Sequence, residues 1–222
     1  MTCLQPIILY SHKLGPNPWK VALILEELGL PYESKYLEFS EAKQEAFKKL
    51  NPNGKLPVIE DPNSGGLTLF ESGAIIEYLI DQYDKDARLH RTSLRDRYLE
   101  RAWLHFQMSA QGPSCGSKVW LGRTYAEADV ACALEYFTKE IKRIIGVLDE
   151  HLRRTGDPYL VGQMASYADL AFVPMYLMID VFVPGYSPAE EFPYFGQWLD
   201  RLLARPAVQK VVADKKALVA PL

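Results

Sequence analysis

Two short segments of this 222-residue chain carry the residue types whose spacing points most directly to chemistry. The first, Asn51-Pro-Asn-Gly-Lys-Leu-Pro-Val-Ile59, reads as a loop that enters a strand at Pro57. The second, Leu69-Phe-Glu-Ser-Gly-Ala-Ile-Ile76, reads as a strand that turns into a helix at Ser72. A strand edge can pair with an extended peptide, and the free N–H groups and positive dipole end of a helix N-terminus can hold a carboxylate. Together the two segments predict a site for a small anionic peptide.

The elements that would position these segments fill residues 1–83. Apolar runs, a helical spacing that ends at Gly29 and the turn sequence Asp61-Pro-Asn-Ser-Gly-Gly66 give a β-α-β-α-β-β-α order. This order predicts a parallel strand pair that is extended by an antiparallel hairpin and covered by helices. The expected elements are Ile7–Tyr10, Trp19–Leu28, Tyr32–Phe39, Glu41–Leu50, Leu56–Ile59, Leu67–Phe70 and Ser72–Tyr83.

After residue 83 the pattern changes from mixed to helical. Residues 84–92 are charged and nearly free of large apolar side chains, which indicates a linker between a domain at 1–83 and a domain at 93–222. The second domain is expected to be all-helical, with a break in its first long helix at Gly112-Pro-Ser-Cys-Gly116. The expected helices are Ser93–Gln111, Tyr125–Arg154, Ser166–Val181, Glu190–Leu203 and a short helix after Pro206.

Composition and charge exclude several classes of function. Hydrophobic residues make up 48% of the chain and charged residues 24%, which is typical of a soluble globular protein. The formal net charge of −3 gives no electrostatic case for binding nucleic acid, and no apolar run is long enough to span a membrane. Cys3, Cys115 and Cys132 are scattered, so neither a disulfide framework nor a metal site is expected. Without a signal-peptide pattern, the reducing cytoplasm is the expected location.

Several motifs in order along the chain resemble those of the cytosolic glutathione transferases. The branch that they look like contains a yeast nitrogen-catabolite regulator known as a prion, fungal transferases, and bacterial relatives with disulfide-bond reductase activity. The resemblance implies a thioredoxin-like N-terminal domain, an all-helical C-terminal domain, glutathione as co-substrate and a homodimer. The motifs are Ser11-His-Lys-Leu-Gly-Pro-Asn-Pro-Trp-Lys-Val21, Asn51-Pro-Asn-Gly-Lys-Leu-Pro57, Phe70-Glu-Ser-Gly-Ala-Ile75, Trp103-Leu-His-Phe-Gln107, Ala168-Asp-Leu-Ala-Phe-Val-Pro174 and Arg205-Pro-Ala-Val208.

The same resemblance implies how glutathione would be held. The Leu56-Pro57 bond is expected to be cis, with the Leu56 backbone pairing with the cysteinyl backbone of the tripeptide. Ser72 would bind the γ-glutamyl carboxylate and Glu71 the γ-glutamyl ammonium group. Lys55 would pair with the glycyl or cysteinyl end, and Lys43 or Gln44 with the glycine carboxylate. The residues alone leave simpler alternatives open: Pro57 merely opens a strand, Ser72 merely caps a helix, and Lys55 is a solvated surface lysine.

The group that activates sulfur is expected in the segment after the first strand. A hydrogen bond to the glutathione thiolate lowers its pKa, and the thiolate is the nucleophile. The bacterial relatives carry a hydroxyl residue where this chain has Gly15, so the Asn17 side-chain amide, near a helix start, is the main candidate. The alternative is that Asn17 only caps that helix; Ser11 and His12 are weaker catalytic candidates. No cysteine lies in this loop, so a mixed disulfide between the protein and glutathione is not expected.

The second substrate is expected to meet the helical domain along one apolar wall with a few polar points. The same residue types at helical spacing are also compatible with an ordinary core. Ser166-Tyr-Ala-Asp169 has the form of a capping box, and its expected role is structural. The candidate wall residues are Trp103, Phe106, Met108, Gln111, Pro113, Cys115 and Trp120.

These residues lead to one main hypothesis of function and three alternatives. The main hypothesis is an enzyme that conjugates the glutathione thiol to a small apolar electrophile such as an epoxide, an activated halide or an enone. The alternatives are a glutathione-dependent reductase of disulfides or organic peroxides, a non-catalytic glutathione-binding regulator, and a glutathione-using step in fungal secondary metabolism.

Overall fold

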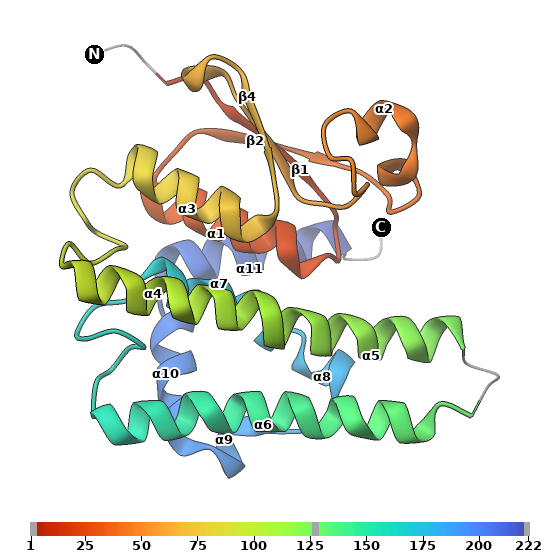
Figure 1. Cartoon of the computed structure of the whole chain (residues 1–222), viewed down its shortest axis with the longest axis vertical. Coiled ribbons are helices and arrows are strands. Elements are labelled where there is room, and N and C mark those ends of the chain that lie inside the picture. The colour runs from red at the N-terminus through yellow and green to blue at the C-terminus, as the bar shows by residue number, and fades with distance from the viewer. Residues whose placement is uncertain (1–3, 126–128, 220–222) are drawn as a thin grey trace. The chain divides into compact units, whose positions relative to one another are not determined.

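The computed structural model describes residues 4–125 and 129–219, and the chain divides into two compact units (Figure 1). Unit 1 comprises the chain up to Arg88 together with the residues from Ala204 on, and unit 2 comprises Leu89–Leu203. The limits 1–83 and 93–222 remain a prediction. In the structure the C-terminal segment that starts at Ala204 belongs to unit 1. The sequence shows only one linker, so it gives no sign that the end of the chain returns to the first unit.

Unit 1 contains a four-stranded mixed sheet in the order β2-β1-β3-β4. The edge strand β2 runs parallel to β1, whereas β3 runs antiparallel to both β1 and β4. A turn of 3₁₀ helix at Pro62–Ser64 joins β3 to β4, where the sequence has its turn residues. The predicted parallel pair with an antiparallel hairpin is therefore confirmed. The strands are β1 (Ile7–Ser11), β2 (Tyr32–Tyr36), β3 (Val58–Asp61) and β4 (Leu67–Phe70).

Two helices of unit 1, α1 (Pro16–Leu28) and α3 (Ser72–Tyr83), pack against each other on one face of this sheet (Figure 1). A short 3₁₀ turn, η1 (Glu41–Lys43), and α2 (Glu45–Lys48) take the place of the single short helix expected at 41–50. The helix α1 ends at Gly29, which has φ 67° and can adopt this left-handed conformation without a side-chain clash.

The last helix, α11 (Pro206–Val219), runs beside α1 within unit 1 (Figure 1). Arg205 makes a two-pronged ion pair with Glu27, and Lys210 pairs with Glu26. Because the Glu27 side chain is largely buried, the Arg205 pair is screened less by solvent than a surface pair would be. These contacts explain why the C-terminal helix joins unit 1.

Unit 2 is all-helical, as the sequence predicted. Among the described residues, no helix is both long enough and apolar enough to cross a bilayer. Every residue of α7 is buried, so this short helix forms the centre of the unit 2 core. The helical elements are α4 (Leu94–Phe106), η3 (Gln107–Gln111), α5 (Gly112–Thr124), α6 (Ala131–Thr155), α7 (Tyr167–Tyr176), α8 (Ile179–Phe182), α9 (Pro188–Glu191) and α10 (Pro193–Leu203).

The predicted helix break at 112–116 is wrong, because the backbone stays helical from α4 through α5. One wider π-helical turn, η3, joins the two helices, and the Gly112 N–H donates to the Gln107 carbonyl. A proline in a regular helix clashes with the carbonyl four residues earlier and lacks an N–H group. The wider turn just before Pro113 relieves that conflict without ending the helix.

The predicted capping box at the start of α7 is confirmed, and its carboxylate does more than cap the helix. Asp169 is completely buried and accepts hydrogen bonds from the Ser166 N–H (2.9 Å) and hydroxyl (2.8 Å). Its second oxygen accepts from the Leu160 N–H (2.9 Å) and from Trp198 Nε1 (2.8 Å). The carboxylate thus links the loop before α7 and helix α10 to α7 itself.

Replacing Asp169 by Ala should lower the free energy of unfolding by roughly 3–5 kcal/mol, because four buried donors lose a charged acceptor. Urea unfolding followed by circular dichroism measures the change. Asp200→Ala, an exposed position on α10, is the matched control and should change stability by less than about 0.5 kcal/mol. Equal denaturation midpoints for the two variants would contradict this role of Asp169.

Candidate functional site

Strand register brings three separate segments to one end of the unit 1 sheet. Val58 of β3 is paired with Tyr10 of β1 and with Phe70 of β4. The residues just beyond these pairs at the same end are Ser11, Pro57 and Glu71. The two segments singled out from the sequence therefore converge, and the loop that precedes α1 starts beside them.

The Leu56-Pro57 bond is cis, as expected. The turn before it is organised by Asn51, whose side chain is 2% exposed. Asn51 Nδ2 donates to the Lys55 carbonyl (2.7 Å), and Asn51 Oδ1 accepts from the Asn53 N–H (2.9 Å). Sequence reasoning gave Asn51 no role, although an Asn at the start of a Pro-Asn-Gly turn is a known signal for this bonding.

The side chain of Leu56 lies against an apolar cluster formed by Ala42, Phe47 and Val58. Its backbone lies beyond the paired residues of β3, which begin at Val58. Packing of the Leu56 side chain against this cluster, together with the hydrogen bonds of Asn51 in the preceding turn, therefore holds the Leu56 main chain in place.

The start of α3 differs from the expectation in one respect. The capping position is Glu71, with φ 70° and ψ 114°, and its carbonyl accepts the first helical bond from the Ile75 N–H (2.9 Å). Ser72 is the first helical residue and is buried, so the expected role of Ser72 as the N-cap is wrong. A positive φ is unfavourable for a glutamate and persists only where surrounding contacts hold it.

A buried lysine stands close enough to Glu71 to interact with its charge. Lys20 of α1 is 1% exposed, and burial lowers its pKa to about 7, while the charge of Glu71 acts in the opposite direction. Sequence reasoning missed Lys20. The signal was a single lysine inside the otherwise apolar run Pro18-Trp-Lys-Val-Ala-Leu-Ile-Leu25.

The loop between β1 and α1 places Asn17 in the first turn of the helix. The N-cap of α1 is Gly15, so the alternative that Asn17 caps this helix is wrong. Asn17 Oδ1 is buried without a hydrogen-bond partner among the described residues, and its Nδ2 donates to none of them. Such an amide, unused by the fold at the positive end of a helix, can donate to an anionic ligand.

The two weaker candidates in this loop have structural partners. Ser11 is buried, and its carbonyl accepts from the Leu37 N–H (2.9 Å). His12 is buried, and its Nδ1 accepts from the backbone N–H groups of Leu14 and Gly15. Nδ1 of His12 is therefore not free to take a proton from a ligand. Cys3 lies outside the described residues.

Two exposed lysines flank the turn that leads to Leu56. Lys43 Nζ donates to the Asn53 carbonyl (3.4 Å), which joins η1 to the turn. The close approach of η1 requires glycine at position 54, where φ is 59° and a Cβ atom would lie 2.8 Å from the Ala42 carbonyl oxygen. Lys43 and Lys55 thus lie at the same turn, and both are exposed.

Comparisons with known proteins decide the family. The family model Glutathione S-transferase, N-terminal domain, matches residues 5–81, and Glutathione S-transferase, C-terminal domain, matches residues 122–206. Glutathione S-transferase-like protein OpS6 of Beauveria bassiana is 63% identical over 218 residues, which cover 98% of this chain and 100% of that protein. The chain belongs to the glutathione S-transferase family.

Other similar proteins come from the Ure2 branch. Transcriptional regulator URE2 of Saccharomyces cerevisiae is 30% identical over 94% of this chain and 68% of that protein. The crystal structure of glutathione transferase URE2P6 from Phanerochaete chrysosporium, in complex with oxidized glutathione, is 38% identical. It matches with a TM-score of 0.89 over 96% of this chain and 98% of that chain. The expected thioredoxin-like domain and helical transferase domain are thereby confirmed.

The residues expected to meet the second substrate of this transferase-family chain lie in unit 2 and differ in accessibility. Gln111 and Cys115 are buried; Gln111 Nε2 donates to the Phe172 carbonyl (3.4 Å). Burial raises the pKa of Cys115 to about 12, so this residue stays a thiol and is not a nucleophile. Trp120 is exposed and contacts the Tyr125 ring. Half-buried or exposed positions are held by Trp103, Phe106, Met108 and Pro113.

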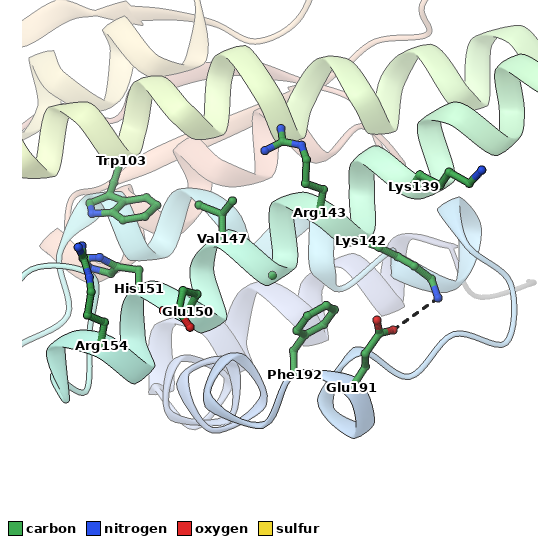
Figure 2. Close-up of a pocket in the computed structure, with 11 residues that line it drawn as sticks. Trp103, Lys139, Lys142, Arg143, Val147, Glu150, His151, Arg154, Glu191 and Phe192 are labelled. Atoms are coloured by element: carbon green, nitrogen blue, oxygen red, sulfur yellow. Dashed lines mark hydrogen bonds and ion pairs between the residues drawn. The ribbon is translucent and has the colours of Figure 1, made fainter.

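Trp103 also lines a hollow of about 810 Å³ whose other lining residues come from α6 and from the end of α9, Glu191 and Phe192 (Figure 2). Its ring lies 4.6 Å from the ring of His151, centroid to centroid. Several Lys and Arg side chains line this hollow, but two of them have carboxylate partners: Lys142 pairs with Glu191 and Arg143 with Glu140. Within the described ranges, no group of three or more His, Cys, Asp or Glu side chains could hold a metal ion.

Replacing Asn51 by Ala should lower the free energy of unfolding by about 2 kcal/mol, because the part-buried hydrogen bonds to the Lys55 carbonyl and the Asn53 N–H are both lost. The change can be measured by chemical denaturation. Asn53→Ala removes an exposed side chain from the same turn and serves as control, with an expected change below about 0.5 kcal/mol. Indistinguishable stability of the two variants would show that Asn51 does not organise the turn.

Proposed function

We propose that this chain binds glutathione at the sheet end described above and transfers its thiol to a small apolar electrophile. The observation that carries the proposal is the convergence of Leu56, Glu71 and the accessible amide of Asn17 at one end of the sheet. Membership of the glutathione S-transferase family supports the choice of ligand.

In this proposal the tripeptide lies extended along the turn and the start of α3. The Leu56 backbone pairs with the cysteinyl residue. Glu71, held at positive φ beside the charge of Lys20, receives the γ-glutamyl ammonium group. The γ-glutamyl carboxylate accepts from Ser72 and the first N–H groups of α3. The glycine carboxylate lies toward Lys43 and Lys55, whose charges match it.

The sulfur would lie at the start of α1. Asn17 Nδ2 donates to the thiolate, and the dipole of α1 adds positive potential, so that both favour loss of the thiol proton. The thiolate then attacks an electrophilic carbon, and a carbon–sulfur bond forms. A halide leaves with the electron pair of its carbon bond, or an epoxide oxygen is released as an alkoxide that takes up a proton from water.

The second substrate is proposed to meet the accessible apolar residues of the helical half. Of the candidate wall residues, the side chains of Phe106, Met108, Pro113 and Trp120 are at least partly accessible, whereas Gln111 and Cys115 are buried. An apolar electrophile suits such side chains, because its binding buries apolar surface.

Reduction of disulfides through glutathione is the second candidate function. The similar structure of URE2P6 holds oxidized glutathione, and Gly15 supplies no hydroxyl donor to the sulfur. In that reaction one glutathione thiolate attacks a disulfide sulfur, a mixed disulfide forms, and a second thiolate completes the exchange. A dedicated step in fungal secondary metabolism remains a further alternative, which the neighbouring genes would identify.

Two assays separate these functions. Conjugation is followed by absorbance with a chlorodinitrobenzene-type electrophile, and disulfide reduction by coupling 2-hydroxyethyl disulfide turnover to glutathione reductase. Turnover of the electrophile supports the main proposal, and turnover of the disulfide alone supports the second. Tight glutathione binding by calorimetry with neither activity would indicate a regulator, and absence of binding would overturn every glutathione-based function.

Asn17→Ala should lower kcat/KM for conjugation by about 10- to 100-fold, because a hydrogen bond to a charged sulfur is lost. The pKa of the bound thiol, read from thiolate absorbance against pH, should rise. Asn63→Ala is the control and should leave both quantities unchanged, since Asn63 lies in the turn between β3 and β4 at the opposite end of the sheet. An unchanged thiol pKa in Asn17→Ala would exclude a direct contact between Asn17 and sulfur.

The protein is proposed to form a homodimer that includes α4. Leu94 and Tyr98 lie one helical turn apart on α4 and are 74% and 59% exposed, an apolar pair that water does not favour. Leu94→Glu with Tyr98→Glu should convert a dimer into a monomer in light scattering. Tyr136→Glu, an equally exposed aromatic position on α6, should leave the mass unchanged. A monomeric wild-type protein would contradict the proposal.

A further inference from the structure

The loop between β1 and α1 is built around a single imidazole. His12 is 5% exposed, and its Nδ1 accepts from the Leu14 N–H (2.9 Å) and from the Gly15 N–H (3.1 Å). Its own carbonyl accepts from Trp19 Nε1 (3.1 Å) in α1. The same residue therefore holds both the loop that leads into α1 and the first turns of the helix.

Packing fixes the ring in this position. The imidazole lies stacked on Phe39, with ring centroids 3.8 Å apart and planes 14° from parallel. A Cβ atom at Gly15 would lie 3.4 Å from His12 Cβ and 3.8 Å from Nδ1. These distances are ordinary van der Waals contacts, so position 15 is a close neighbour of the ring.

The two backbone donors define the protonation state of the ring. Nδ1 can accept only while it carries no proton, so the neutral imidazole must have its proton on Nε2. Two charged groups face the ring. Glu38 Oε2 lies 3.6 Å from Nε2 and favours the imidazolium, whereas Lys13 opposes it. Burial outweighs Glu38 and lowers the pKa of His12 below its ordinary 6.5.

We propose that His12 is a positioning residue that sets Asn17 for glutathione, and that protonation of its imidazole releases the loop and weakens glutathione binding. The inference rests on the proposed function. A proton on Nδ1 would turn the acceptor into a donor that faces two N–H groups, and both hydrogen bonds would be lost together. The N-cap Gly15 is one of these donors, so the start of α1 and Asn17 would lose their anchor.

The direction of the pH effect follows from the two loop states. In the released loop the imidazole is exposed to water and has the ordinary pKa of 6.5, whereas in the ordered loop its pKa is lower. The released state therefore binds more protons as the pH falls through 6.5, and acid favours it. The ordered loop, and with it tight glutathione binding, is fully present above that pH and declines below it.

Two substitutions at position 12 distinguish the effect of the hydrogen-bond acceptor from the effect of the rest of the side chain. His12→Asn keeps an oxygen acceptor near the position of Nδ1 but cannot be protonated in this range, whereas His12→Leu removes the acceptor. Calorimetry from about pH 7.5 to about pH 5.5 spans the ordinary titration of histidine and leaves the glutathione carboxylates ionised. Other titrating groups, Lys20 among them, are common to all three proteins, so differences between them report on position 12.

The wild-type protein should bind glutathione about tenfold more weakly at the acidic end, since two backbone hydrogen bonds are lost on protonation. His12→Asn should bind within about threefold of wild type at pH 7.5 and show a flatter pH profile. His12→Leu should bind about tenfold or more weakly at every pH. The ¹⁵N shift of His12 Nδ1 should be that of an unprotonated acceptor at pH 7.5 and should change as the ordered loop is lost.

Three results would overturn the inference while leaving the proposed function intact. These are a pH profile of His12→Asn that matches wild type, wild-type affinity in His12→Leu at pH 7.5, and a protonated Nδ1 at that pH. If His12→Leu does not fold, the His12→Asn profile and the nitrogen shift still decide. A wild-type protein that binds no glutathione at any pH instead overturns the proposed function, and this role of His12 falls with it.

Discussion

The pairing of Val58 with Tyr10 on one side and Phe70 on the other is the constraint on which the candidate site depends. β1 is distant in the sequence from the hairpin of β3 and β4, and the register of these three strands decides which loop ends meet. A slip of one residue in β3 would turn Val58 away from the apolar cluster around Phe47 and would move the turn before it. Burial of this cluster therefore maintains the geometry of the site as well as the stability of unit 1.

Buried polar side chains hold the loops in place by binding their backbone groups. Asn51 and His12 each bind two backbone groups of a loop, and in unit 2 Asp169 binds two backbone N–H groups and two side-chain donors. Loops lack the regular bonding of helices and strands, so their backbone groups need such partners when they are buried. Removing one of these side chains would leave buried donors or acceptors unpaired, which is why each can hold a loop in one conformation.

The environment proposed for the sulfur distinguishes this chain from a transferase with a hydroxyl donor at position 15. Gly15 has no hydroxyl group and its N–H donates to the His12 ring, and the proposed donor to the sulfur is the side-chain amide of Asn17 in the first turn of α1. An amide is a neutral donor and stabilises a thiolate less than a cation would, so the dipole of α1 carries more of the effect. Conjugation and disulfide exchange both use the resulting thiolate, and the second substrate decides between them.

Much of this architecture was predictable from local patterns. The strand and helix order, the end of α1 at Gly29, the start of α3 at residue 72 and the capping box of α7 follow from short-range periodicity and from turn and cap residues. The family motifs added the cis bond before Pro57 and the expected ligand. Where local signals conflicted, as with Pro113 inside a helical stretch, the sequence predicted a break and the fold used a π-helical turn.

Only the tertiary structure decided how the site is held. The sequence gives no role to Lys20 or Asn51 and presents His12 only as a weaker catalytic candidate, and the structural roles of all three arise from partners brought close by folding. The positive φ of Glu71 and the grouping of α11 with unit 1 are set in the same way. Residue type and spacing determine local structure because those interactions span a few residues, whereas burial and charge at a site depend on segments that meet only once the chain has folded.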